Sequence, residues 1–141
     1  MKITLLIILF AAFMTSCKSK MIYPENLPKD VAMKKILNQN FGSDSTGLRN
    51  MEQEIVAMIS TKNCDDPKLW KIAPMGTKPC GGPAYFIAYP IDMELNILPK
   101  IKTYSLQEAA FNEKYGIMSD CTMAEEPTGI SCEKGKAVLE Y

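Results

Sequence analysis

The chain has 141 residues, of which 47% are hydrophobic and 23% charged, and this composition is typical of one soluble domain rather than of a disordered or multi-spanning protein. It contains no histidine, which excludes Ser/His and Cys/His nucleophile pairs and removes the commonest metal ligand. The 16 basic residues balance the 16 acidic residues, so the net charge gives no indication of nucleic acid as a partner.

The beginning of the chain has the pattern of a cleaved signal peptide. A lysine at position 2 is followed by an apolar run over residues 3–13 and then by small residues that end at Cys17. The run is shorter than the ~20 residues that a membrane-spanning helix needs. The segment resembles a bacterial lipoprotein signal, which is cut just before a cysteine whose thiol receives a diacylglycerol, although Met14 stands where leucine is usual. We therefore expect a signal peptide over residues 1–16 and lipidation of Cys17; the alternative is an ordinary secretory signal with an incidental cysteine.

A polar tether and then a first helix are expected next. Residues 17–45 read as the lipidated cysteine and a tether with at most one short helix, which would start near Pro28. Residues 46–141 form the predicted domain. A Ser/Thr cluster just before Gly47 can cap a helix, and the apolar residues that follow recur at three- and four-residue spacing. The pattern predicts a helix over residues 47–60.

Two apolar runs, residues 69–73 and 85–89, predict strands. The second run is aromatic and β-branched and is bounded by prolines, so it is expected to be largely buried. Trp70, Tyr85 and Tyr89 could instead form an aromatic platform for a ligand, but aromatic residues on strands are more often core residues.

A second helix and a hairpin complete the predicted elements. Residues 91–115 place apolar side chains on one side of a helix, which Pro99 must either start or kink, and Gly116 is expected to end it in a left-handed conformation. Residues 133–136 carry a glycine between two short apolar runs, which predicts a hairpin.

These elements predict an α+β domain in which two amphipathic helices pack on one face of a small, mainly antiparallel sheet, with two disulfides. The predicted core contains Trp70, Ile87 and Tyr89, and Ile55 and Phe111 are expected to pack onto them from the helices. A domain of roughly 95 residues can hold one core, and disulfides would add to its stability.

Setting Cys17 aside leaves an even number of cysteines, Cys64, Cys80, Cys121 and Cys132, which suits disulfides in an oxidising compartment. Their spacing matches neither a zinc site nor a Cys-x-x-Cys redox pair. Three pairings are possible. Short loops that contain proline and glycine favour Cys64 with Cys80 and Cys121 with Cys132. The first of these pairs has a geometric difficulty, because a strand between its members would hold them apart.

The order of several features resembles small cysteine-containing secreted proteins and lipoproteins of Bacteroidota. The features are Trp70, the Cys80-Gly81-Gly82-Pro83 turn, the aromatic strand after it, Ser119-Asp120-Cys121 and the terminal strand. The resemblance covers about residues 50–141 and implies an extracytoplasmic domain with no known activity. The two glycines permit a tight turn, and no Lys-Ser/Thr or helix start follows them as in a phosphate-binding loop.

The sequence therefore predicts a non-enzymatic binding domain that is lipid-anchored in the cell envelope, in the outer membrane facing the periplasm. We expect no cofactor, no metal and no nucleic acid, and a protein or a small ligand as partner. The first alternative is a protease or hydrolase inhibitor, which would use residues 77–83 and 122–131 as rigid loops and Lys78 as a cleavage-resistant basic residue. The second is a small hydrolase with two carboxylates across a cleft.

Overall fold

The computed structural model describes the backbone of residues 29–141 and the side chains from Asn40 onward. The predicted signal peptide, Cys17 and the beginning of the tether lie outside the described residues. The chain divides into two compact units, Met1–Ala32 and Met33–Tyr141. All described strands and both disulfides belong to the second unit.

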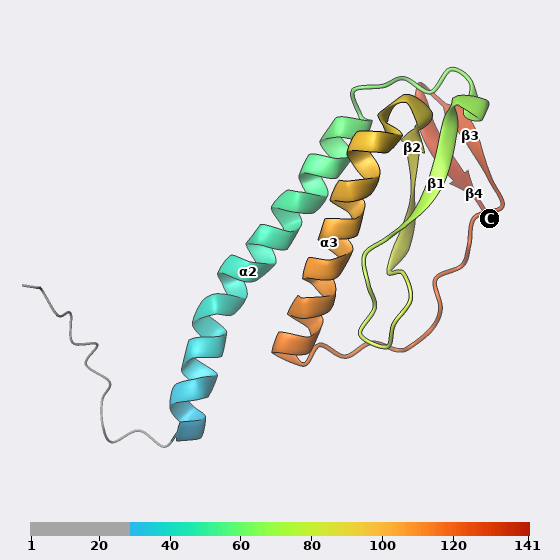
Figure 1. Cartoon of the computed structure of the whole chain (residues 1–141). Coiled ribbons are helices and arrows are strands. Elements are labelled where there is room, and N and C mark those ends of the chain that lie inside the picture. The colour runs from blue at the N-terminus through green and yellow to red at the C-terminus, as the bar shows by residue number, and fades with distance from the viewer. Residues whose placement is uncertain (1–28) are drawn as a thin grey trace, which may run out of the picture. The chain divides into compact units, whose positions relative to one another are not determined.

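Two helices and two hairpins make up the described fold (Figure 1). The described strands form two separate two-stranded antiparallel sheets, β1 with β2 and β3 with β4, rather than one sheet. This arrangement confirms a small α+β fold with two disulfides. None of the described helices is both long and apolar enough to cross a bilayer. In chain order the elements are α2 (Lys29–Ile59), the 3₁₀ turn η2 (Pro67–Leu69), β1 (Trp70–Met75), β2 (Tyr85–Pro90), the turn η3 (Ile91–Met93), α3 (Glu94–Tyr115), β3 (Gly129–Glu133) and β4 (Lys136–Glu140).

Helix α2 begins much earlier than the sequence pattern predicts. The Ser/Thr cluster that was expected to cap a helix at Gly47 lies inside the helix. Ser43 Oγ donates to the carbonyl of Asn40 at 2.9 Å, and Thr46 Oγ1 donates to the carbonyl of Gly42 at 2.8 Å. Ser and Thr hydroxyl groups can either cap the start of a helix or donate to a carbonyl of the preceding turn within it, and here they do the second. The predicted helix start is therefore wrong, and the helix extends into the segment interpreted as a tether.

Helix α3 ends as predicted but does not begin at Pro99. It starts five residues earlier, at Glu94, directly after the turn η3, and Pro99 lies within it. Gly116 ends the helix in the left-handed conformation, with φ +59, and its N–H donates to the carbonyls of Asn112 and Glu113. The predicted C-terminal cap is confirmed.

The β1–β2 hairpin lies between the helices and the second hairpin. Its side chains alternate between two faces, as strand geometry requires. One face packs against both helices in a core whose buried members are Ile55, Ala73, Met75, Tyr89, Ile97, Ile101 and Tyr104. The opposite face contributes Trp70 and Ala88 to a second cluster, which also contains Cys64 and partly buried residues of β3 and β4. The helices therefore cover one face of the β1–β2 hairpin, as expected.

The predicted core is confirmed in most of its members. Tyr89 is 3% and Ile55 1% exposed, and Ile87 is partly buried against the same core, whereas Trp70, 7% exposed, is buried in the second cluster. Phe111 is the exception, because it packs against Phe41 of α2, with ring centroids 5.2 Å apart, rather than against the strands. The reason is the extra length of α2, which gives the end of α3 a helix to pack on.

The disulfides pair differently from the prediction. Cys64 is bonded to Cys132 and Cys80 to Cys121, with Cα atoms 5.3 and 5.5 Å apart. The predicted pairing of Cys64 with Cys80 and Cys121 with Cys132 is therefore wrong. Strand β1 is extended between Cys64 and Cys80, and it separates them in the way that made this pair geometrically difficult. The first disulfide joins the segment after α2 to β3, and the second joins the two loops at residues 76–84 and 116–128.

Candidate functional site

The described part of the chain has a groove that runs beside β2, between the end of α2 and strand β4. We call it the β2 groove. It has a volume of about 500 Å³, within the range of known ligand sites. Its apolar lining consists of Val56, Ile59, Trp70, Phe86, Ile87, Ala88, Ala137 and Leu139, and its polar lining consists of Ser60, Lys62, Asn63, Lys134, Gly135 and Lys136. The lining therefore carries three positive charges and no negative charge.

The turn between β3 and β4 positions two of these lysines. Lys134 and Gly135 both have positive φ, +51 and +76, as the two central residues of a tight hairpin turn require. The N–H of Cys64 donates to the carbonyl of Gly135 at 2.9 Å. The disulfide of Cys64 with Cys132 also attaches this segment to β3, the strand that leads into the turn. The turn is thus fixed beside the end of α2, and it brings Lys134 and Lys136 to the rim of the β2 groove.

The lysines at the rim differ in their partners. Lys62 forms an ion pair with Asp92. Among the ion pairs of the described residues, none involves Lys134 or Lys136. Two positive charges therefore face solvent beside an apolar groove, which is an arrangement suited to an acidic and partly apolar partner.

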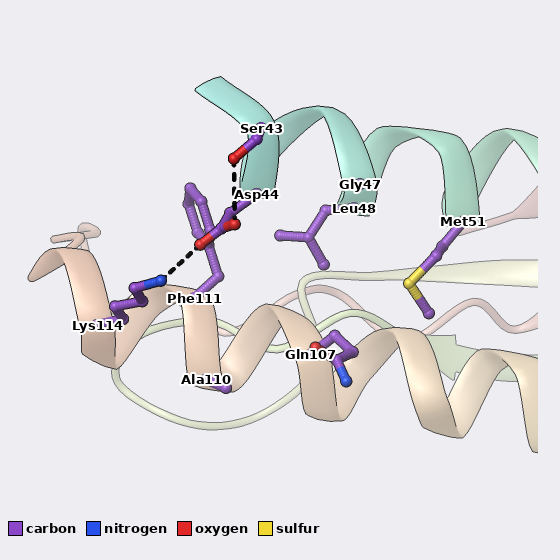
Figure 2. Close-up of a pocket in the computed structure, with 9 residues that line it drawn as sticks. All are labelled: Ser43, Asp44, Gly47, Leu48, Met51, Gln107, Ala110, Phe111 and Lys114. Carbon is purple, nitrogen blue, oxygen red and sulfur yellow. Dashed lines mark hydrogen bonds and ion pairs between the residues drawn. The ribbon is translucent and has the colours of Figure 1, made fainter. Parts of the chain in front are cut away.

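A second cleft lies between α2 and α3, but its charged groups already have partners (Figure 2). The carboxylate of Asp44 accepts hydrogen bonds from Lys114 Nζ and from the Tyr115 hydroxyl, each at 2.7 Å. The bond from Lys114, and then that from Tyr115, holds the pKa of Asp44 below its usual value. The apolar lining of the cleft consists of Leu48 and Met51 from α2 and of Ala110 and Phe111 from α3. These contacts make the cleft a seam that holds the two helices together.

The Asp44 pair leads to a prediction about pH. A carboxyl whose pKa is lowered on folding stabilises the folded state above its unfolded pKa of about 3.9, and this stabilisation is lost as the pH falls through the lowered value. We expect Asp44→Asn to lower the thermal midpoint slightly at neutral pH, and we expect this difference to shrink as the pH falls through the lowered pKa of Asp44, because the wild-type carboxyl then also becomes neutral. Melting curves of both chains across this range test the prediction, and a pH-independent difference would contradict it.

Two tyrosines, of which Tyr104 is buried and Tyr85 partly buried, form hydrogen bonds with glutamates of the helices. The Tyr85 hydroxyl donates to Glu52 Oε1 at 2.7 Å, and the Tyr104 hydroxyl donates to Glu108 Oε1 at 3.2 Å. Burial is the main cause that raises the pKa of both tyrosines. Glu108 Oε2 also accepts from the backbone N–H of Thr77 at 2.6 Å, so this carboxylate fixes the start of the β1–β2 loop.

Gly76 shows how tightly that loop is held. Its φ is +74, and a Cβ placed there would lie 2.5 Å from Glu108 Oε2 and 2.8 Å from Ala84 Cβ. Its N–H donates to Ser105 Oγ at 3.0 Å. Only glycine fits both the conformation and the space.

The hydrolase alternative can be compared with the two described carboxyl groups whose pKa is shifted, Asp44 and Glu94. Such an enzyme needs a carboxyl whose pKa is raised, so that it can donate a proton. Among the described carboxyls, the two with a resolved shift, Asp44 and Glu94, have their pKa values lowered, chiefly by hydrogen bonds from Lys114 and Lys71 respectively. A lowered pKa keeps both groups ionised and paired.

The loops considered for an inhibitor are joined, but Lys78 does not project from them. Gly81 and Gly82 have φ values of +92 and +79, which agrees with the predicted tight turn. Cys80 of this turn is bonded to Cys121. Lys78 Nζ donates to the carbonyl of Thr122, and its side chain is only 22% exposed. Lys78 therefore holds the two loops together rather than presenting a basic residue to a protease.

Sequence reasoning missed the β2 groove, and Trp70 is the one groove residue that it considered as a ligand contact. No three described His, Cys, Asp or Glu side chains gather in a way that could hold a metal ion. Comparison of the chain with models of known families, with curated proteins and with solved structures found no match.

Proposed function

We propose that the protein is a lipid-anchored, extracytoplasmic binding domain without a catalytic role. The observation that carries the proposal is the pairing of Cys64 with Cys132 and of Cys80 with Cys121. Disulfides of this kind persist in oxidising compartments outside the cytoplasm. They account for every cysteine of the chain except Cys17, which stands at the end of the lipoprotein-like signal. Lipidation requires a cysteine at that position.

The surface features of the domain support a binding role. The β2 groove combines apolar walls with Lys134 and Lys136, which have no ion-pair partner among the described residues, whereas the partly buried Glu52 and Glu108 form structural hydrogen bonds. The residues after Cys17, Lys18-Ser19-Lys20, lack the acidic residues that often mark surface-exported lipoproteins of the group that this chain resembles. We therefore propose an outer-membrane anchor that faces the periplasm, with a protein as the partner.

The anchor is tested by Cys17→Ala. We expect the wild-type chain in the membrane fraction and the variant in the soluble fraction, because two acyl chains, at ~0.8 kcal/mol for each buried CH₂ group, give stable membrane binding. The control is the Cys80→Ala/Cys121→Ala chain, which loses a disulfide but keeps Cys17 and should remain with the membrane. A Cys17→Ala chain that stays equally membrane-bound would contradict the proposal.

A further inference from the structure

The edge of β2 that faces away from β1 has backbone groups with no strand partner among the described residues. Within the described residues, β2 pairs only with β1. In an antiparallel pair, residue pairs that exchange hydrogen bonds alternate with pairs that do not. Pro74 lies opposite Phe86 and Pro90 lies opposite Trp70. Because proline has no N–H to donate, these two pairs are the ones that do not exchange hydrogen bonds. The pair of Ile72 with Ala88 lies between them, two residues from each, so it is also of this kind. The N–H and C=O groups of Phe86 and Ala88 therefore point away from β1.

Both residues line the β2 groove, where Phe86 is partly buried and Ala88 is 7% exposed. The groove has α2 on one side, where Val56 and Ile59 line it, and β4 on the other side. An extended chain laid along the edge would direct its side chains alternately to these two sides. Strand β2 has six residues, so the edge accommodates a segment of about five residues, or ~17 Å.

We propose that the β2 groove binds an extended, acidic segment of a partner protein, which adds to the β1–β2 sheet as a third strand. The inference rests on the proposed binding function and names the partner class for it. Main-chain hydrogen bonds to Phe86 and Ala88 supply affinity in this mode, and the side-chain contacts supply specificity. The edge has no charged residue or bulge that would prevent pairing, and its one proline, Pro90, stands at the end of the strand.

The charge of the groove determines which strand fits. Lys134 and Lys136 stand at its rim without an ion-pair partner among the described residues, and no carboxylate lines it. A second copy of this chain, paired edge to edge through β2, would add a strand that carries no carboxylate, so it would not neutralise these lysines. A segment with Asp or Glu beside β-branched residues complements both the rim and the walls.

The probe for this proposal is a library of random seven-residue peptides, screened against the purified, oxidised full chain. We expect enrichment of sequences that combine acidic with β-branched residues. The Lys134→Glu/Lys136→Glu chain should bind an enriched peptide at least tenfold more weakly. The matched control is Lys102→Glu, an exposed lysine of α3 outside the groove, which should leave binding unchanged.

Strand pairing is tested separately by peptide N-methylation and by hydrogen exchange, and neither test needs a variant of the protein. N-methylation of alternate peptide residues should abolish binding, whereas N-methylation of the residues between them should not. On binding, the amides of Phe86 and Ala88 should exchange hydrogen more slowly, and the Ile87 amide, which already bonds to β1, should not change.

Three results would overturn the proposal. The first is that the wild-type chain enriches no more peptides than the Lys134→Glu/Lys136→Glu chain does. The second is binding that tolerates N-methylation at every peptide position. The third is slower hydrogen exchange, on binding, of amides that lie away from β2. None of these results bears on Cys17, so failure of the groove is distinguishable from failure of the lipid anchor.

Discussion

Replacing Cys64 and Cys132 by alanine is expected to lower the free energy of unfolding by about 4 kcal/mol, because their disulfide links residues 68 positions apart and so restricts the unfolded chain. Cys64 is also 3% exposed and packs with Trp70 and Ala88, so its loss leaves a cavity in the second cluster. Urea denaturation, followed by circular dichroism, measures the change.

The matched control is the Cys80→Ala/Cys121→Ala chain. Its disulfide links residues 41 positions apart and joins two exposed loops, so chain entropy again predicts about 4 kcal/mol but no cavity is left. We therefore expect the smaller loss in the control. A larger loss in the control than in the Cys64→Ala/Cys132→Ala chain would contradict the structure of the second cluster.

Trp70→Ala is expected to cost about 3–5 kcal/mol of unfolding free energy, since it removes a large buried side chain and leaves a cavity. The side chain is 7% exposed and lies where the β1–β2 hairpin meets the second hairpin. Against a total stability of ~5–15 kcal/mol, such a loss brings the domain close to unfolding.

Leu69→Ala is the control for Trp70→Ala, because the neighbouring side chain is 62% exposed. A surface substitution of this kind changes stability by about 0.5 kcal/mol or less. Denaturant midpoints of the two variants should therefore differ widely. Equal, small effects would place Trp70 at the surface and would revive the aromatic platform as a ligand site.

The elements that follow from local sequence signals could be predicted. Strands β1 and β2, the end of α3 at Gly116 and the hairpin around Gly135 all depend on residues close together in the chain. The length of α2 could not be predicted, because the hydroxyl groups of Ser43 and Thr46 can either cap a helix or bond back within one. Which of these two hydrogen bonds forms depends on whether α2 extends to Phe41, whose ring packs against α3 in a tertiary contact.

The disulfide pairing and the β2 groove depend on contacts between distant parts of the chain. Cys64 meets Cys132 because the second hairpin packs against Trp70 and Ala88, and no spacing rule contains that information. The same packing places Lys134 beside α2 and creates the groove. The apolar run of β2 and the two lysines around Gly135 were visible in the sequence, but their proximity was not.

The intact mass of the protein extracted from cell membranes tests the central proposal, a lipid-anchored and disulfide-bonded extracytoplasmic domain, most directly. The predicted result is a chain of residues 17–141 that carries a diacylglycerol on Cys17, with an alkylating reagent reaching the other four cysteines only after reduction. A chain with an unmodified Cys17 thiol, or with free thiols among Cys64, Cys80, Cys121 and Cys132 before reduction, would contradict the proposal.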